Sequence, residues 1–149
     1  MTATTSSKVQ IGTISEGTLR AADLLDAFGW ELRRLGYAGI AMMEAHELLD
    51  MNEDAQDAAW EARAEECVSD LIEALEGYAL PYTYFGTLEG DGADYGFWPD
   101  HAAIGEALRN GQQIDDEEHL TDDGYIISVS DHGNVSVMDG DRNLIWDCV

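Results

Sequence analysis

Basic residues are scarce in this chain of 149 residues. It has seven lysines and arginines against 31 aspartates and glutamates, which gives a formal net charge of −24. Binding to nucleic acid requires lysine and arginine to neutralise phosphates, so direct binding to DNA or RNA is disfavoured. An anionic membrane surface is disfavoured for the same reason. Like charges repel within a compact fold, so an excess of this size favours a partner with a basic surface.

Cysteines and long apolar stretches are also rare. Cys67 and Cys148 are the only cysteines, and their separation fits neither a disulfide framework nor a zinc site. No apolar run approaches the roughly 20 residues of a membrane span. Residues 1–7, which we expect to form a flexible tail, lack the basic and apolar regions of a signal peptide. We therefore expect a cytoplasmic protein.

The hydrophobic content of 45% is too high for a disordered chain, so we expect one folded domain over residues 1–149. Apolar periodicity predicts helices and alternation predicts strands. The predicted helices are residues 18–35, 40–49, 54–76 and 100–109, and the predicted strands are 82–88, 95–98, 125–130, 134–138 and 143–148, with an acidic loop at 112–123. This order indicates an α+β fold, in which three N-terminal helices pack on an antiparallel sheet of four to five strands and one short helix lies between strands.

The acidic residues are concentrated in two segments. Residues 50–76 hold ten acids and one base, and residues 115–123 hold six acids and no base. Within the predicted helix 54–76 several acids recur every four residues, which aligns them along one side with a rise of about 6 Å per step. The predicted partner-binding residues are Glu53, Asp57, Glu61, Glu65, Asp70 and Glu73, with a second patch at Asp115, Asp116, Glu117 and Glu118.

Helix stability does not explain this row of acids, because each like-charge pair at such a spacing costs about 0.2–0.5 kcal/mol. A rigid row of carboxylates can instead stand in for a phosphate backbone in the basic groove of another protein. Two alternatives to this hypothesis stay open. In the first, the row is simply a solvated face of an acidic protein. In the second, it is part of an adaptation to high salt, which would fit the presence of a single lysine, Lys8.

Several segments partly match metal sites. His46-Glu-Leu-Leu-Asp50 differs from a zinc-hydrolase signature by one residue, because Asp50 replaces the second histidine. Asp91 and Asp139 each begin a segment similar to a Ca²⁺ loop, but neither has the required spacing, and a hairpin turn explains both. The remaining histidines, His101, His119 and His132, are not near a recognisable nucleophile motif. We therefore expect no metal, no cofactor and no catalytic residue, with a small metal-dependent enzyme as the alternative.

Three blocks of the sequence resemble a known family. They are Gly12-Thr-Ile with the following Thr18-Leu-Arg, the central Phe85-Gly and Gly90-Asp-Gly-Ala-Asp-Tyr-Gly-Phe-Trp-Pro99, and Asp131-His-Gly-Asn-Val with the terminal Leu144-Ile-Trp-Asp-Cys-Val149. Together they resemble a family of small acidic accessory proteins of bacteriophages and plasmids, which has no established activity. The resemblance implies a mobile element acting inside a bacterial cell, and it supplies no functional residues.

These observations together predict a protein that acts by binding. The most specific hypothesis is an inhibitor from a mobile element that mimics nucleic acid and blocks the basic site of a host protein. A CRISPR effector, a restriction enzyme or another DNA-binding protein would be the target. Neutralising Asp57, Glu61 and Glu65 together is then expected to abolish partner binding without lowering thermal stability. A virion or assembly protein is a further alternative, and the oligomeric state stays open.

Overall fold

The computed structural model describes residues 9–148 and divides them into two compact units. The helical unit comprises residues 12–79 and 85–97, and the sheet unit comprises residues 9–11, 80–84 and 98–148. The predicted tail at residues 1–7 lies outside the described residues. The expectation of a single domain stays a prediction. We describe each unit separately.

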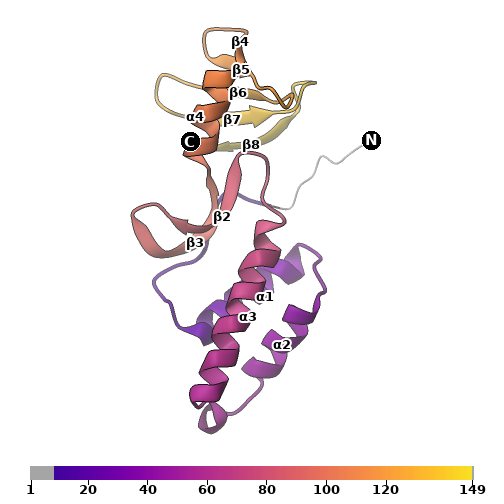
Figure 1. The fold of residues 1–149 in the computed structure, drawn as a ribbon, viewed down its shortest axis with the longest axis vertical. Helices are drawn as coiled ribbons and strands as arrows, with labels where there is room; N and C mark the ends of the chain where they lie inside the picture. Colours follow the sequence, from indigo (N-terminus) through magenta and orange to yellow (C-terminus); the bar gives the residue numbers. More distant parts are fainter. Residues whose placement is uncertain (1–8, 149) are drawn as a thin grey trace. The chain divides into compact units, whose positions relative to one another are not determined.

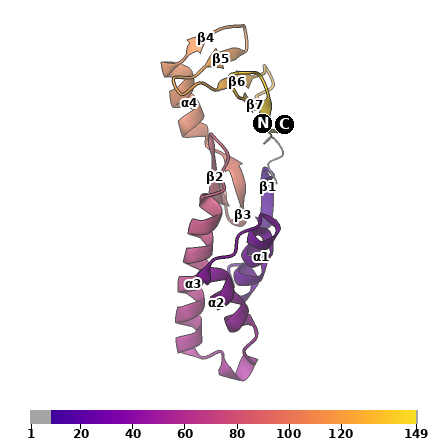
Figure 2. The ribbon, with the colours of Figure 1, turned by 90° about the vertical axis from the view of Figure 1, so that its right-hand side faces the viewer.

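Three helices form most of the helical unit: α1 (Ala21–Arg34), α2 (Ile40–Leu49) and α3 (Ala58–Glu76). Each of them packs against the other two (Figures 1 and 2). Apolar residues at helical spacing form the buried stripes, as the sequence predicts. The largest fully buried side chains of the three helices are Leu25, Phe28, Leu32, Leu48, Cys67, Leu71 and Leu75.

The third helix begins later than predicted. Residues Glu53–Ala55 form a separate 3₁₀ turn, η2, and Gln56 leaves the helical region with φ −85° and ψ 68°. Asp57 is the N-cap of α3, and its carboxylate accepts a hydrogen bond from the backbone N–H of Trp60 at 3.0 Å. The predicted start at residue 54 is therefore wrong, because the side chain of Asp57 terminates the helix on its N-terminal side.

The predicted aromatic hairpin is present. Strands β2 (Thr83–Leu88) and β3 (Asp91–Pro99) are joined by a tight turn at Gly90, which has φ 91°. Strand β1 (Gly12–Ser15) pairs antiparallel with β3, so the sheet order is β1-β3-β2. In the helical unit the hairpin contributes the aromatic rings of Phe85, Tyr95 and Phe97. The ring centroid of Phe28 on α1 lies 5.4 Å from that of Phe85 and 5.1 Å from that of Tyr95.

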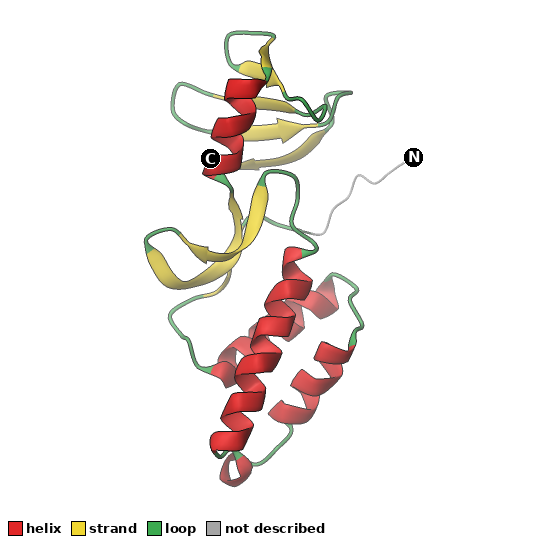
Figure 3. Cartoon of the chain, viewed as in Figure 1, coloured by secondary structure: helices red, strands yellow, loops and turns green. Residues whose placement is uncertain are grey.

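The sheet unit contains a second antiparallel sheet of five strands in sequential order, with helix α4 (His101–Asn110) (Figure 3). The strands are β4 (Gln112–Gln113), β5 (Glu118–Leu120), β6 (Ile126–Val129), β7 (Val135–Met138) and β8 (Leu144–Cys148). Ile127, Val137 and Trp146 are cross-strand neighbours on one face and form the core together with Ile104 of α4. The indole N–H of Trp146 donates to the carbonyl of Pro81 at 2.7 Å, which anchors β8 to the segment 80–84.

The α+β fold class is confirmed, with two corrections. The strands form two sheets, of three and five strands, where one sheet of four to five was expected. The expected acidic loop at 112–123 contains the short strands β4 and β5. The predicted helix at 100–109 is confirmed, and Asp100 caps it by accepting from the N–H of Ala103 at 3.0 Å.

Candidate partner-binding surface

The solvent side of α3 is acidic along its whole length. Apart from Glu76 at its end, the exposed acids of α3, which we call the acidic face, are Glu61, Glu65, Glu66, Asp70 and Glu73. Successive residues of an α-helix are rotated by about 100°, which places Glu65, Glu66, Asp70 and Glu73 on the half of α3 opposite its buried stripe and Glu61 at the edge of that half. The predicted acidic residues of this helix therefore lie in solvent and do not contribute to the core.

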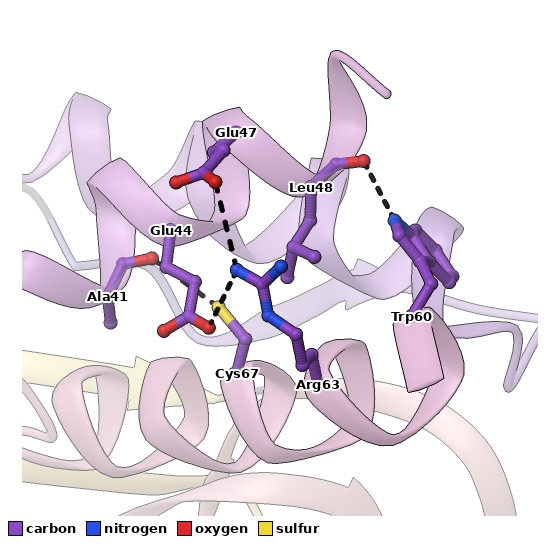
Figure 4. A network of polar contacts seen from close by, with 7 residues as sticks. All are labelled: Ala41, Glu44, Glu47, Leu48, Trp60, Arg63 and Cys67. Atoms are coloured by element: carbon purple, nitrogen blue, oxygen red, sulfur yellow. Dashed lines mark hydrogen bonds and ion pairs between the residues drawn. The ribbon is translucent and has the colours of Figure 1, made fainter. Parts of the chain in front are cut away.

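No arginine of the described residues compensates the acidic face. Among residues 9–148, no arginine lies within 4 Å of any of its five carboxylates. Arg63, the only base of α3, is directed to α2, where its guanidinium lies 3.6 Å from the carboxylate of Glu44 and 3.9 Å from that of Glu47 (Figure 4). The base within the acidic segment thus neutralises a neighbouring helix and leaves the acidic face with its full charge.

The two N-terminal members of the predicted row do not belong to the acidic face. Glu53 is exposed but lies in η2, outside α3. Asp57 is exposed, but one of its carboxylate oxygens is engaged as the cap of α3. Glu76, at the other end of the helix, accepts from the backbone N–H of Phe85 at 2.7 Å. Both ends of α3 therefore have an acid with a structural role, and no such side-chain contact to other described residues is made by the five acids between them.

The second predicted patch lies in the sheet unit. Asp115, Asp116 and Glu117 are exposed, as a solvent-facing patch requires. Glu118 differs, because it lies on β5 and both of its carboxylate oxygens accept from the guanidinium of Arg142, at 3.0 and 3.1 Å. Only the first three of the four predicted residues are thus without a basic partner among the described residues.

A groove between α2 and α3 was not predicted from the sequence. It has a volume of about 550 Å³ and is lined by Tyr37, Ile40, Ala41, Glu44, Asp70, Glu73 and Ala74. Two members of the acidic face, Asp70 and Glu73, therefore also line a concave and partly apolar surface. A signal for it was present in the sequence, because Ile40-Ala-Met-Met43 has more apolar residues than one buried stripe of a helix can use.

The residues considered for metal binding have other roles in the structure. Between residues 9 and 148, no three His, Cys, Asp or Glu side chains are grouped as a metal site would require. Asp50 is the C-cap residue that ends α2, after His46 in its last turn. Asp91, which begins the first of the two segments similar to a Ca²⁺ loop, accepts from the backbone N–H of Ala93 at 3.1 Å. Asp94 of the same segment is buried on β3 and accepts from the hydroxyl of Thr13 at 2.8 Å. Asp139 accepts from backbone N–H groups of its own turn, which lowers the pKa of its carboxyl.

Shifted pKa values also occur at Cys67 and Asp123. Burial, with the charges of Glu44 and Asp70, raises the pKa of Cys67 to about 11, and its thiol lies 3.5 Å from the carbonyl of Ala41 (Figure 4). In the sheet unit, hydrogen bonds from the hydroxyls of Thr121 and Tyr82 lower the pKa of Asp123. Neither group is arranged as a nucleophile with a base.

No helix among residues 9–148 combines the length and the apolar character needed to cross a bilayer. The chain matches no protein-family model, no curated protein and no solved structure at a significant level.

Proposed function

We propose that this protein is an inhibitor that binds the nucleic-acid-binding site of another protein through the acidic face of α3. The observation that supports this most directly is the uncompensated charge of that face: five exposed carboxylates on one rigid helix, with no described base within 4 Å. The partner is a basic protein of a bacterial host, such as a CRISPR effector, a restriction enzyme or another DNA-binding protein. The resemblance of the sequence to accessory proteins of phages and plasmids supports the choice of a bacterial host in this proposal.

The spacing of the charges is suited to a single nucleic acid strand. From Glu61 to Glu73 the helix rises by about 18 Å, so the mean spacing of the five acids along the helix axis is roughly 4–5 Å. One strand of B-DNA has one charge per ~3.4 Å, and the duplex has one per ~1.7 Å. A groove that binds single-stranded nucleic acid therefore meets nearly its usual charge density on α3, whereas a duplex-binding groove meets well under half of it.

Rigidity supports the same function. A disordered acidic tail would lose conformational entropy on binding, whereas α3 is held before binding by its buried stripe and by the packing of α1 and α2. An isolated row of carboxylates on a helix would also be opposed by self-repulsion. The tertiary contacts of α3 hold these charges in place, so little of that cost is incurred when the partner binds.

The test is capture of a partner from a bacterial lysate, followed by competition. We expect the immobilised protein to retain a nucleic-acid-binding protein at 0.1 M salt and to release it as salt rises to 1 M, because the Debye length falls from about 10 to about 3 Å. An excess of single-stranded oligonucleotide should release the same protein. A retained protein that oligonucleotides do not displace would contradict the proposal.

Charge-matched variants show whether the acidic face is responsible. In the first variant the acidic face is neutralised by Glu61→Gln, Glu65→Gln, Glu66→Gln, Asp70→Asn and Glu73→Gln, while Asp57 is kept as the cap. The control has the same net charge and neutralises five exposed acids elsewhere, Glu16, Asp54, Glu89, Asp131 and Asp147. The first variant should lose the partner and the control should retain it. Equal retention by both would exclude α3 as the binding surface.

A further inference from the structure

The groove between α2 and α3 has an apolar part as well as carboxylates. Ile40, Ala41 and Ala74 contribute aliphatic surface, and the aromatic ring of Tyr37 adds to it. Among these residues, Ile40 is 82% exposed. Apolar surface of this kind gains free energy when a partner removes it from water. A partner with complementary apolar side chains is therefore favoured over a purely ionic one.

The ring of Tyr37 is held in place at this groove. It packs edge-on against Tyr78, with 6.5 Å between the ring centroids. Gly39, the N-cap of α2, lies so close to the ring that a Cβ atom at this position would overlap the ring and its hydroxyl. The absence of a side chain at residue 39 thus allows the ring to occupy this position.

The carboxylates of the groove can form ion pairs with a cation, as an ion pair within the chain at the same two helices illustrates. The guanidinium of Arg63 lies between the carboxylates of Glu44 and Glu47, at the seam of the same two helices (Figure 4). Asp70 and Glu73 stand further along α3 and have no such base within 4 Å among the described residues. Because α2 and α3 shield one side of these carboxylates from water, a cation between them is screened less than at an open surface.

We propose that this groove docks an amphipathic segment of the basic partner. An arginine or lysine of that segment lies between Asp70 and Glu73, and an apolar side chain beside it covers Ile40. The inference rests on the proposed function, since it takes the partner to be basic, and it adds a specific contact to the general attraction of the acidic face. A second copy of this chain is a poor occupant, because two molecules with a net charge of −24 repel each other.

The test uses the full-length protein and two synthetic helical peptides of equal charge. The first peptide has arginine and leucine on one face, and in the second peptide serine replaces each leucine. Binding is measured by calorimetry at 0.1 M salt. We expect the arginine–leucine peptide to bind about tenfold more tightly than the arginine–serine peptide, because only the former can cover the apolar part of the groove.

Two matched pairs of variants locate the contact. Asp70→Asn with Glu73→Gln removes two groove carboxylates, and Glu61→Gln with Glu65→Gln removes two carboxylates of the same helix outside the groove. Ile40→Ala truncates an exposed apolar side chain of the groove. Met43→Ala truncates one that does not line it. Each groove variant should bind the arginine–leucine peptide about tenfold more weakly than the unaltered protein does, and each matched variant less than about threefold more weakly.

The outcomes separate this inference from the proposed function. Equal binding of the two peptides, or equal weakening by a groove variant and its match, overturns the docking site. Capture of an oligonucleotide-displaceable protein through the acidic face would still stand in that case. The reverse result, groove-dependent peptide binding without such a captured protein, would support the docking site and refute the nucleic-acid mimic. Circular dichroism of each variant shows that the helices are intact.

Discussion

The position of an acid along α3 should decide whether its removal stabilises the protein. Two double variants test this. The first combines Asp70→Asn with Glu73→Gln, and the second combines Glu61→Gln with Glu65→Gln. Each removes two negative charges from exposed positions of one helix. Glutamate and glutamine have similar helix propensities, as do aspartate and asparagine, so the intrinsic preference of the helix is nearly unchanged. The expected difference is electrostatic.

The pair near the C-terminus should be strongly stabilising. Neutralising Asp70 and Glu73 removes three like-charge pairs at helical spacing, those of Asp70 with Glu66 and Glu73 and that of Glu73 with Glu76. At about 0.2–0.5 kcal/mol each, these pairs contribute about 0.6–1.5 kcal/mol. Glu73 also lies in the last turn, which has no basic residue. Relief of its repulsion from the helix dipole adds about 0.3–1 kcal/mol. The sum is about 1–2.5 kcal/mol.

The pair near the N-terminus should have almost no effect. Neutralising Glu61 and Glu65 removes their mutual repulsion and the repulsion between Asp57 and Glu61, a gain of about 0.4–1 kcal/mol. Glu61 lies in the first turn of α3, however, where a negative charge interacts favourably with the helix dipole. Its loss costs about 0.3–1 kcal/mol, so the two contributions nearly cancel.

Thermal unfolding followed by circular dichroism at low ionic strength measures this difference. For a chain of this size the C-terminal pair should raise Tm by about 2–10 °C, and the N-terminal pair should leave it nearly unchanged. In 1 M salt most of the difference should disappear, because the Debye length falls to about 3 Å. An equal gain from both pairs, or a gain that salt does not reduce, would refute the reasoning.

Three further predictions concern single residues. Asp57→Ala should lower the free energy of unfolding by about 1 kcal/mol in urea titrations, because the N–H of Trp60 loses its acceptor, whereas Asp57→Asn keeps a capping oxygen and should cost much less. The pKa of Asp123 is lowered in the folded state, so its ionised carboxylate stabilises the fold above the unfolded pKa of about 3.9, and this stabilisation is lost as pH falls through the folded pKa. Asp123→Ala should therefore flatten the decline of stability below about pH 4, and an unchanged decline would contradict this. Cys67 is buried, with its pKa raised to about 11, so at pH 8 iodoacetamide should modify the half-buried Cys148 first and reach Cys67 only on unfolding, as mass spectrometry of the peptides would show.

Local patterns in the sequence predicted the helices well. The apolar stripe of α1, which includes Leu25, Phe28 and Leu32, is buried as its period of 3.6 residues requires. The role of Asp57 was missed although its signal was present, since an aspartate just before an apolar periodic segment is a typical N-cap. The regular spacing from Glu53 to Glu65 masked the break, because it continues without change across the non-helical Gln56.

Other features have no local signal in the sequence. Strand β1 pairs with β3, so that Gly12 lies opposite Phe97, and no short stretch of sequence specifies so distant a pairing. Strand β4 has only two residues, too few to alternate. The acids of the groove were predicted as members of a row, but the groove itself depends on how α2 packs on α3. The exposure of these acids is thus predictable from their charge and spacing, and the shape of the surface that they line is not.

The helical unit is discontinuous in the chain, and this has a consequence for protein synthesis. Phe28 of α1 packs on Phe85 and Tyr95, so the ribosome must translate the hairpin before the core around α1 can close. The segment that must follow α3 is residues 80–97. At 5–20 residues per second its translation takes roughly 1–4 s. During this time the three helices have a strong negative charge, and their core lacks the aromatic side chains of the hairpin. The mutual repulsion of many such nascent chains would then oppose their aggregation on a polysome. This benefit of the acidic composition does not depend on a binding partner.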